Sequence, residues 1–156
     1  MPEQKGSYIR ALRILAIALM VGVIVFYILA VALRLVDFMD TTLLQDYAVY
    51  IVIGLGVVAA LFFIGGRNFF NKKIETIKNS SETIGEKLNL YRSALIICYA
   101  AFEGIAIFAI ILFIVTGNFW FSGIVFLMLL AMISKFPTRQ RVIDQLGLDW
   151  NEQQEL

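Results

Sequence analysis

The sequence predicts an all-α integral membrane protein with four transmembrane helices, and composition is the first reason. Of its 156 residues, 60% are hydrophobic and only 16% are charged, against about 25% charged residues in ordinary soluble domains. The mean hydropathy is +0.83. A soluble domain of this length could not bury so much apolar surface, and a disordered chain would need the opposite composition. Because backbone groups in lipid must be paired internally, long apolar segments are expected to be helices.

Four segments approach the length of about 20 apolar residues that a helix needs to cross a bilayer. Residues 12–36 form the first, with charges only near its ends, and residues 47–66 form the second, which has no charge. The third, residues 93–117, carries one charge near its middle. The fourth, residues 119–136, is the shortest and begins with an aromatic pair. These segments predict a transmembrane domain.

The basic residues outside these segments lie on one side of them. They precede the first segment, occupy the connection 67–92 and lie at or beyond the end of the fourth segment. The connection 37–46 holds three aspartates and no basic residue. Because basic residues collect on the cytoplasmic side of membranes, both termini are expected in the cytoplasm.

The connection 67–92 is expected to be partly helical. Its stretch NFFNKKIETIKN repeats apolar residues at helical spacing and should continue the second helix. Residues 79–81 should break that helix, and Thr83 with Glu86 forms a capping-box pattern that predicts a new helix from near Ile84. Anionic lipid headgroups, rather than nucleic acid, are the expected contacts of four basic residues, Arg67, Lys72, Lys73 and Lys78.

Residues 137–156 form a predicted cytoplasmic amphipathic tail after the transmembrane domain of residues 1–136. Thr138 follows Pro137 and is expected to cap a short helix that contains Val142 and Leu146. Such a helix could lie at the membrane interface or dock on a partner.

Glu103 is the acid near the middle of the third segment. An ionised carboxylate is costly there, so we expect a protonated side chain that is buried at a helix contact. One hypothesis is a proton or sodium site, with Tyr99 one turn away; the other is an interhelical hydrogen bond that orients the bundle. Candidate partners for that bond are Tyr99, Tyr27, Tyr50, Ser122 and Ser134.

Small residues in two segments predict close helix packing. Ala100 and Gly104 are four residues apart in the third segment, and Gly54 and Gly56 lie in the second. Faces of this kind let transmembrane helices approach closely.

No pattern for catalysis is present in the sequence. It contains no histidine and one cysteine, Cys98, so it offers neither the commonest catalytic base nor a zinc cluster. It also lacks a phosphate-binding glycine loop, a CxxC motif and a nucleophile elbow. An enzyme is therefore not expected, and no cofactor or metal is predicted.

The run YAAFEGIAIFAIILF resembles the carboxylate helix of the rotor-ring proteolipid, subunit c, of rotary ATP synthases. In that family a mid-membrane Glu also follows small and aromatic residues, and the resemblance extends over about residues 47–117. The chain departs from the family where KNSSETIGEK replaces an Arg-Gln-Pro turn and where bulky residues replace a glycine repeat in the second segment. The resemblance therefore implies a carboxylate hairpin rather than membership of a rotor ring.

A second resemblance covers most of the chain. The runs LNLYRSALIICYAAFEG, IVTGN and KFPTRQRVIDQLGL are similar to small four-span membrane proteins of Bacteroidota that have no assigned activity. That group often carries a basic residue where this chain has Cys98. The resemblance implies a multi-pass protein of the bacterial inner (cytoplasmic) membrane and adds nothing on mechanism.

Two functions stay open from the sequence. The first is a non-enzymatic subunit or scaffold of a larger membrane assembly, with other membrane subunits or further copies of the chain as partners. The alternative is a proteolipid-like protein that binds or translocates protons or sodium at Glu103.

Overall fold

The computed structural model describes residues 7–36 and 46–153, and the regular secondary structure in them is helical. The aspartate-bearing connection at 37–45, like residues 1–6 and 154–156, lies outside the described residues. The helices are α1 (Ser7–Leu35), α2 (Ala48–Lys78), α3 (Ile84–Thr116), α4 (Trp120–Ser134), α5 (Arg139–Leu146) and α6 (Trp150–Gln153).

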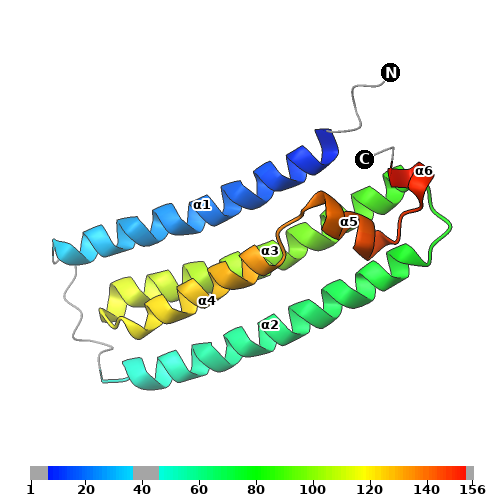
Figure 1. The fold of residues 1–156 in the computed structure, drawn as a ribbon. Coiled ribbons are helices and arrows are strands. Elements are labelled where there is room, and N and C mark those ends of the chain that lie inside the picture. The colour runs from blue at the N-terminus through cyan, green and yellow to red at the C-terminus, as the bar shows by residue number, and fades with distance from the viewer. Residues whose placement is uncertain (1–6, 37–45, 154–156) are drawn as a thin grey trace.

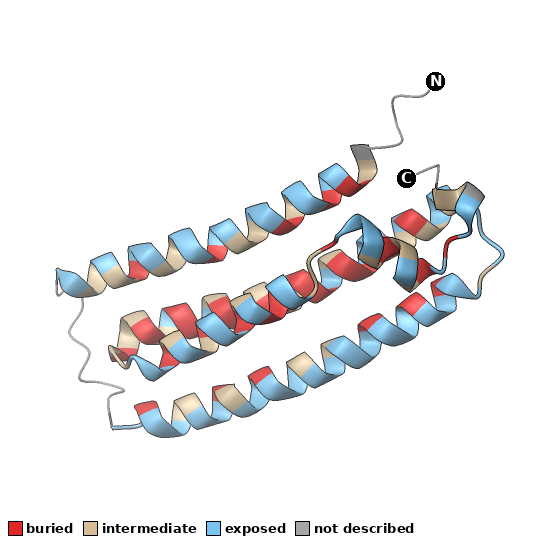
Figure 2. Cartoon of the chain, viewed as in Figure 1, coloured by how far each residue is buried: buried red, intermediate tan, exposed pale blue. Residues whose placement is uncertain are grey.

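Helix α3 is the centre of the bundle. It packs against α1, α2 and α4, and Figure 1 shows α1 and α2 on opposite sides of the α3–α4 pair. Buried residues are dense on α3 and α4 but form only narrow stripes on α1 and α2 (Figure 2). On α1 the stripe recurs at helical spacing, with Leu12, Ala16 and Val23 almost fully buried. The rest of the apolar surface of α1 and α2 faces outward, as expected for helices surrounded by lipid.

Three of the described helices, α1, α2 and α3, are long and apolar enough to cross a membrane. A fourth crossing requires α4 and α5 to be counted together across a bend of 71°. The predicted fourth segment, residues 119–136, forms a helix of only 15 residues that ends at Ser134, a rise of about 22 Å. The fold is thus that of a helical, multi-pass membrane protein with three or four spans.

The helix ends on either side of the α2–α3 connection confirm the sequence predictions. Helix α2 continues to Lys78, and Asn79 follows as its C-cap. Helix α3 begins at Ile84, and the Glu86 carboxylate accepts hydrogen bonds from the Thr83 backbone N–H and hydroxyl at 3.0 and 2.8 Å. These bonds satisfy groups that the first turn of a helix leaves unpaired.

The turn between α3 and α4 depends on one glycine. Gly117 has a φ of 67°, and its N–H donates to the Phe113 carbonyl at 2.9 Å. This left-handed cap ends α3 and lets α4 begin at Trp120, antiparallel to α3. The near absence of a loop there agrees with the sequence.

Helix α5 folds back onto the bundle. The Thr138 hydroxyl accepts from the Arg141 backbone N–H at 3.3 Å, so the predicted cap is present. Val142 and Leu146 are buried, and the helix packs against the extension of α2 beyond the transmembrane length. The apolar side of this helix is therefore covered by the protein itself, because Ile74 and Ile77 of α2 share its core.

Candidate functional site

Glu103 is half-buried in the chain and lies on the border between the buried and exposed faces of α3. Phe102 on one side is buried, whereas Ala100 and Gly104 on the other are exposed. The side chain lies 13 residues before Thr116 at the end of the helix, a rise of about 20 Å. Within one copy of the chain, Glu103 therefore does not reach the buried position expected for it.

The Tyr99 side chain bonds to helix α4 rather than to Glu103, which lies one turn away on α3. Its hydroxyl is buried and donates to the Met132 carbonyl of α4 at 3.1 Å. The bond ties α3 to α4 in the centre of the molecule and occupies the one proton that the hydroxyl can donate. A pairing with Glu103 one turn away is not made.

The other candidate partners of Glu103 are also placed elsewhere. The Ser134 hydroxyl donates to the Ala131 carbonyl at 2.7 Å, and the Tyr27 ring packs against Phe113 at a centroid distance of 6.0 Å. Tyr50 is 74% exposed. Among the described residues, the buried Ser122 hydroxyl has no hydrogen-bond partner at all. No described serine or tyrosine from this set is thus brought to the carboxylate.

The small residues lie on open surface rather than at a contact within the chain. Gly54, Ala100 and Gly104 are exposed, and Gly56 is half-buried. A Cβ added at any of the three glycines would meet nothing within 4 Å. The close approach of α2 and α3 predicted from these residues is therefore not made there.

A cavity separates α2 from α3 beside Gly104. Its volume is about 350 Å³, and branched and aromatic side chains such as Val58, Phe62 and Phe108 line it. A second cavity of about 360 Å³ follows along the same two helices, shares Phe62, and reaches the buried thiol of Cys98. Together the two cavities form an apolar groove along α2 and α3.

The four basic residues expected at lipid headgroups all lie exposed on the last third of α2. They are Arg67, Lys72, Lys73 and Lys78.

Two further arginines have a structural role that the sequence did not reveal. Arg141 donates to the Ser134 and Phe136 carbonyls at 2.6 and 3.2 Å, and Arg13 of α1 donates to the Pro137 carbonyl at 3.2 Å. Ser134 ends α4 and the residues between it and α5 are not helical, so these carbonyls lack partners within a helix. The Phe136 carbonyl also accepts from the Thr138 N–H at 3.0 Å. Pro137 signals such a break, but the spacing of residues does not say which side chains satisfy it.

In the part of the chain that the structure describes, no group of three or more Cys, Asp, Glu or His side chains could hold a metal ion. The arrangement around Glu103 offers one carboxylate, a neighbouring tyrosine already bonded to α4, and an apolar surround.

Comparison with known proteins adds no relative. No family model matches the chain, and neither the curated proteins nor the solved structures contain a match.

Proposed function

We propose that this protein is a small non-enzymatic subunit or scaffold of a larger assembly in the bacterial inner membrane, with both termini in the cytoplasm. The observation that supports it best is the open face of α2 and α3. Gly54, Ala100 and Gly104 are exposed there beside an apolar groove, and no described residue fills the space next to the two glycines. Exposed small residues are the surface on which transmembrane helices pack closely.

The orientation follows from charge. The exposed basic residues of α2 lie at the same end of the bundle as α5 and the first turns of α1 (Figure 1). A cytoplasmic location for this end agrees with the tendency of basic residues to collect on the cytoplasmic side of membranes. Helix α5 and the exposed Trp150, at 74%, would then face partners in the cytoplasm.

A leucine at Gly104 tests the assembly. Because a Cβ at Gly104 meets no described atom within 4 Å and a cavity lies beside it, Gly104→Leu should be tolerated within the chain but prevent another helix from approaching. Gly123→Leu is the matched control, since Gly123 is an exposed glycine of α4 that also has open space around it. The measurement is the protein mass of the particle, determined without its bound detergent after purification from the native membrane in mild detergent. We expect the wild type and Gly123→Leu to exceed the 17.6 kDa chain, and Gly104→Leu to lose the additional mass. A wild-type particle that is strictly monomeric would contradict the proposal.

The second candidate function is an ion site at Glu103. It is favoured by one observation: the carboxylate lies half-buried in an apolar helix while the hydroxyl of Tyr99, one turn away in sequence, is bonded to Met132. In this case a carbodiimide should modify Glu103, and sodium or high pH should slow the reaction.

Substitutions at Glu103 separate the two functions. Glu103→Gln keeps the shape of the side chain, so in a subunit or scaffold it should assemble and act like the wild type. Glu103→Ala should weaken helix association by about 1 kcal/mol, the scale of an interhelical hydrogen bond in lipid. Particle mass and a cellular assay are the readouts. Normal assembly of Glu103→Gln with complete loss of the cellular role would favour the ion site instead.

A further inference from the structure

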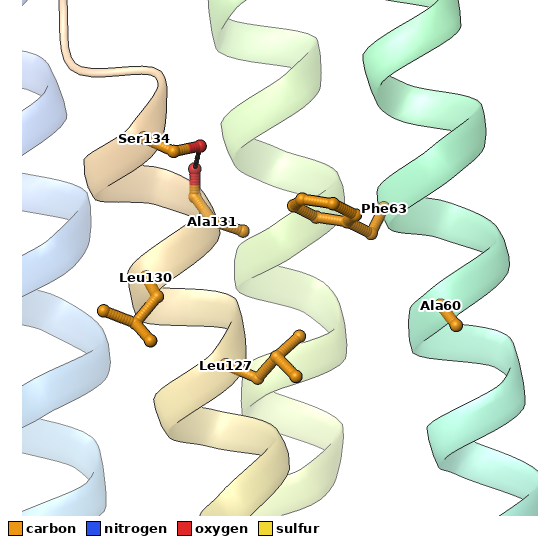
Figure 3. Close-up of a pocket in the computed structure, with 6 residues that line it drawn as sticks. All are labelled: Ala60, Phe63, Leu127, Leu130, Ala131 and Ser134. Carbon is orange, nitrogen blue, oxygen red and sulfur yellow. Dashed lines mark hydrogen bonds between the residues drawn. The ribbon is translucent and has the colours of Figure 1, made fainter.

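Two cavities between α2 and α4 adjoin each other and differ in chemistry. The apolar cavity has a volume of about 340 Å³ and is lined by Ala60, Phe63, Leu127, Leu130, Ala131 and Ser134. Figure 3 shows Phe63 reaching from α2 toward α4, with Leu127 and Ala131 on the α4 side. The polar cavity has a volume of about 350 Å³ and is lined by Phe63, Arg67, Asn71, Phe102, Ser134 and Lys135. Because Phe63 and Ser134 line both, the two form one groove with a polar mouth.

The polar mouth of the groove lies at a position along α2 that matches the border of the membrane's hydrocarbon core. Arg67 lies 19 residues beyond Ala48 at the start of α2, a rise of about 28 Å and so close to the thickness of the hydrocarbon core. Ser134 and Lys135 mark the end of α4 on the other wall. The polar mouth therefore lies at headgroup level, and the apolar cavity lies within the hydrocarbon.

The polar mouth is suited to an anion. Arg67 and Lys135 contribute two positive charges, Asn71 and Ser134 are neutral, and none of the described acidic residues lines this cavity. Burial is the main cause that lowers the pKa of Lys135, and the charges of Arg67 and Arg141 lower it further. The Lys135 ammonium group is held 4.7 Å from the centre of the Phe70 ring. Arg141 itself is occupied by the Ser134 and Phe136 carbonyls. An anion between Arg67 and Lys135 would relieve the repulsion between like charges.

We propose that this groove binds one anionic phospholipid. Its phosphate lies between Arg67, Lys135 and the Asn71 amide, and one acyl chain follows Phe63 and Leu127 into the apolar cavity. A guanidinium matches the geometry of phosphate oxygens, and basic pockets between transmembrane helices are suited to lipid headgroups. The proposal rests on the membrane placement given above but not on any assembly partner. It differs from general attraction of headgroups to α2 because it names a single site with an acyl-chain cavity.

The experiment compares lipids on the full chain in detergent. Native mass spectrometry counts bound lipid after titration with phosphatidylglycerol or phosphatidylcholine, and melting temperature is followed with the same lipids and with inorganic phosphate. We expect one retained phosphatidylglycerol per chain, preferred over phosphatidylcholine, and no stabilisation by inorganic phosphate. Equal retention of the two lipids would overturn the proposal, and so would equal stabilisation by inorganic phosphate, which would indicate a simple anion site.

Two variants and one control test the polar and the apolar part of the groove separately. Arg67→Gln should weaken phosphatidylglycerol retention about fivefold, the scale of one basic residue at an anionic surface, whereas Lys72→Gln, an exposed cation of the same helix outside the groove, should not. Ala60→Phe fills the apolar cavity from an exposed position and should weaken retention of both lipids without removing a charge. Equal losses in Arg67→Gln and Lys72→Gln, or an unaffected Ala60→Phe, would overturn the proposal. If the particle is monomeric but still holds one lipid, the proposed assembly is contradicted and the proposed lipid site is not.

Discussion

Phe70→Ala is expected to lower the free energy of unfolding by about 3–5 kcal/mol, the usual cost of removing a buried aromatic ring. Phe70 is 1% exposed and joins three elements at the basic end of the bundle. Its ring meets Tyr91 of α3 edge-on at 5.9 Å, and the Lys135 ammonium group lies over it. Denaturant unfolding in detergent is the measurement.

The adjacent Phe69 provides the control for this change. It is 47% exposed on the same helix, so Phe69→Ala should cost about 1 kcal/mol or less. Equal effects of the two substitutions would show that the packing of Phe70 on Tyr91 and Lys135 does not stabilise this end of the molecule.

Gly117→Ala is expected to destabilise the protein by about 2 kcal/mol, for two reasons that act together. At a φ of 67° a Cβ is strained, and this is the larger cost; the Arg34 guanidinium, the far end of a flexible side chain, would also have to move away from the added atom. Thermal unfolding of the purified protein measures the sum of the two costs.

A second variant separates the two costs of Gly117→Ala. In an Arg34→Ala background the overlap is removed, so the same glycine substitution should cost only the backbone strain of about 1–2 kcal/mol. Gly117→Asn in the wild-type background should lose less from backbone strain, because Asn tolerates the left-handed conformation. If Gly117→Ala costs the same with and without Arg34, the contact between the two residues does not matter for stability.

Local signals in the sequence predicted the helix ends well. The Thr83 and Glu86 pair, the break after Lys78 and the short turn at Gly117 each depend on residues close in sequence, and the structure has all three. The predicted fourth segment runs two residues past the end of α4, which ends at Ser134 with Lys135 as its C-cap. Pro137 disfavours helical conformation at the residue before it, and hydropathy alone does not register this.

The sequence pattern could not predict which residues of distant helices contact each other. Periodicity places Tyr99 on a face of α3 but does not say that Met132 of α4 offers its carbonyl there. The spacing of Ala100 and Gly104 shows that a close approach is possible, but it does not say that both residues are exposed, with a cavity beside Gly104. The pairing of Arg67 with Lys135 across one cavity likewise depends on how α2 and α4 pack.

The shortness of α4 has a consequence for the surrounding membrane. In the proposed orientation α4 crosses the membrane without α5. Its 15 residues rise about 22 Å, roughly 8 Å less than a typical hydrocarbon core. Exposed Trp120 anchors one end at an interface, and Lys135 follows the other end. Hydrophobic mismatch of this kind draws the two leaflets together beside the helix. The protein should therefore thin the bilayer along the α4 flank only and favour thinner membranes, an asymmetry that α1, with 29 residues, does not share.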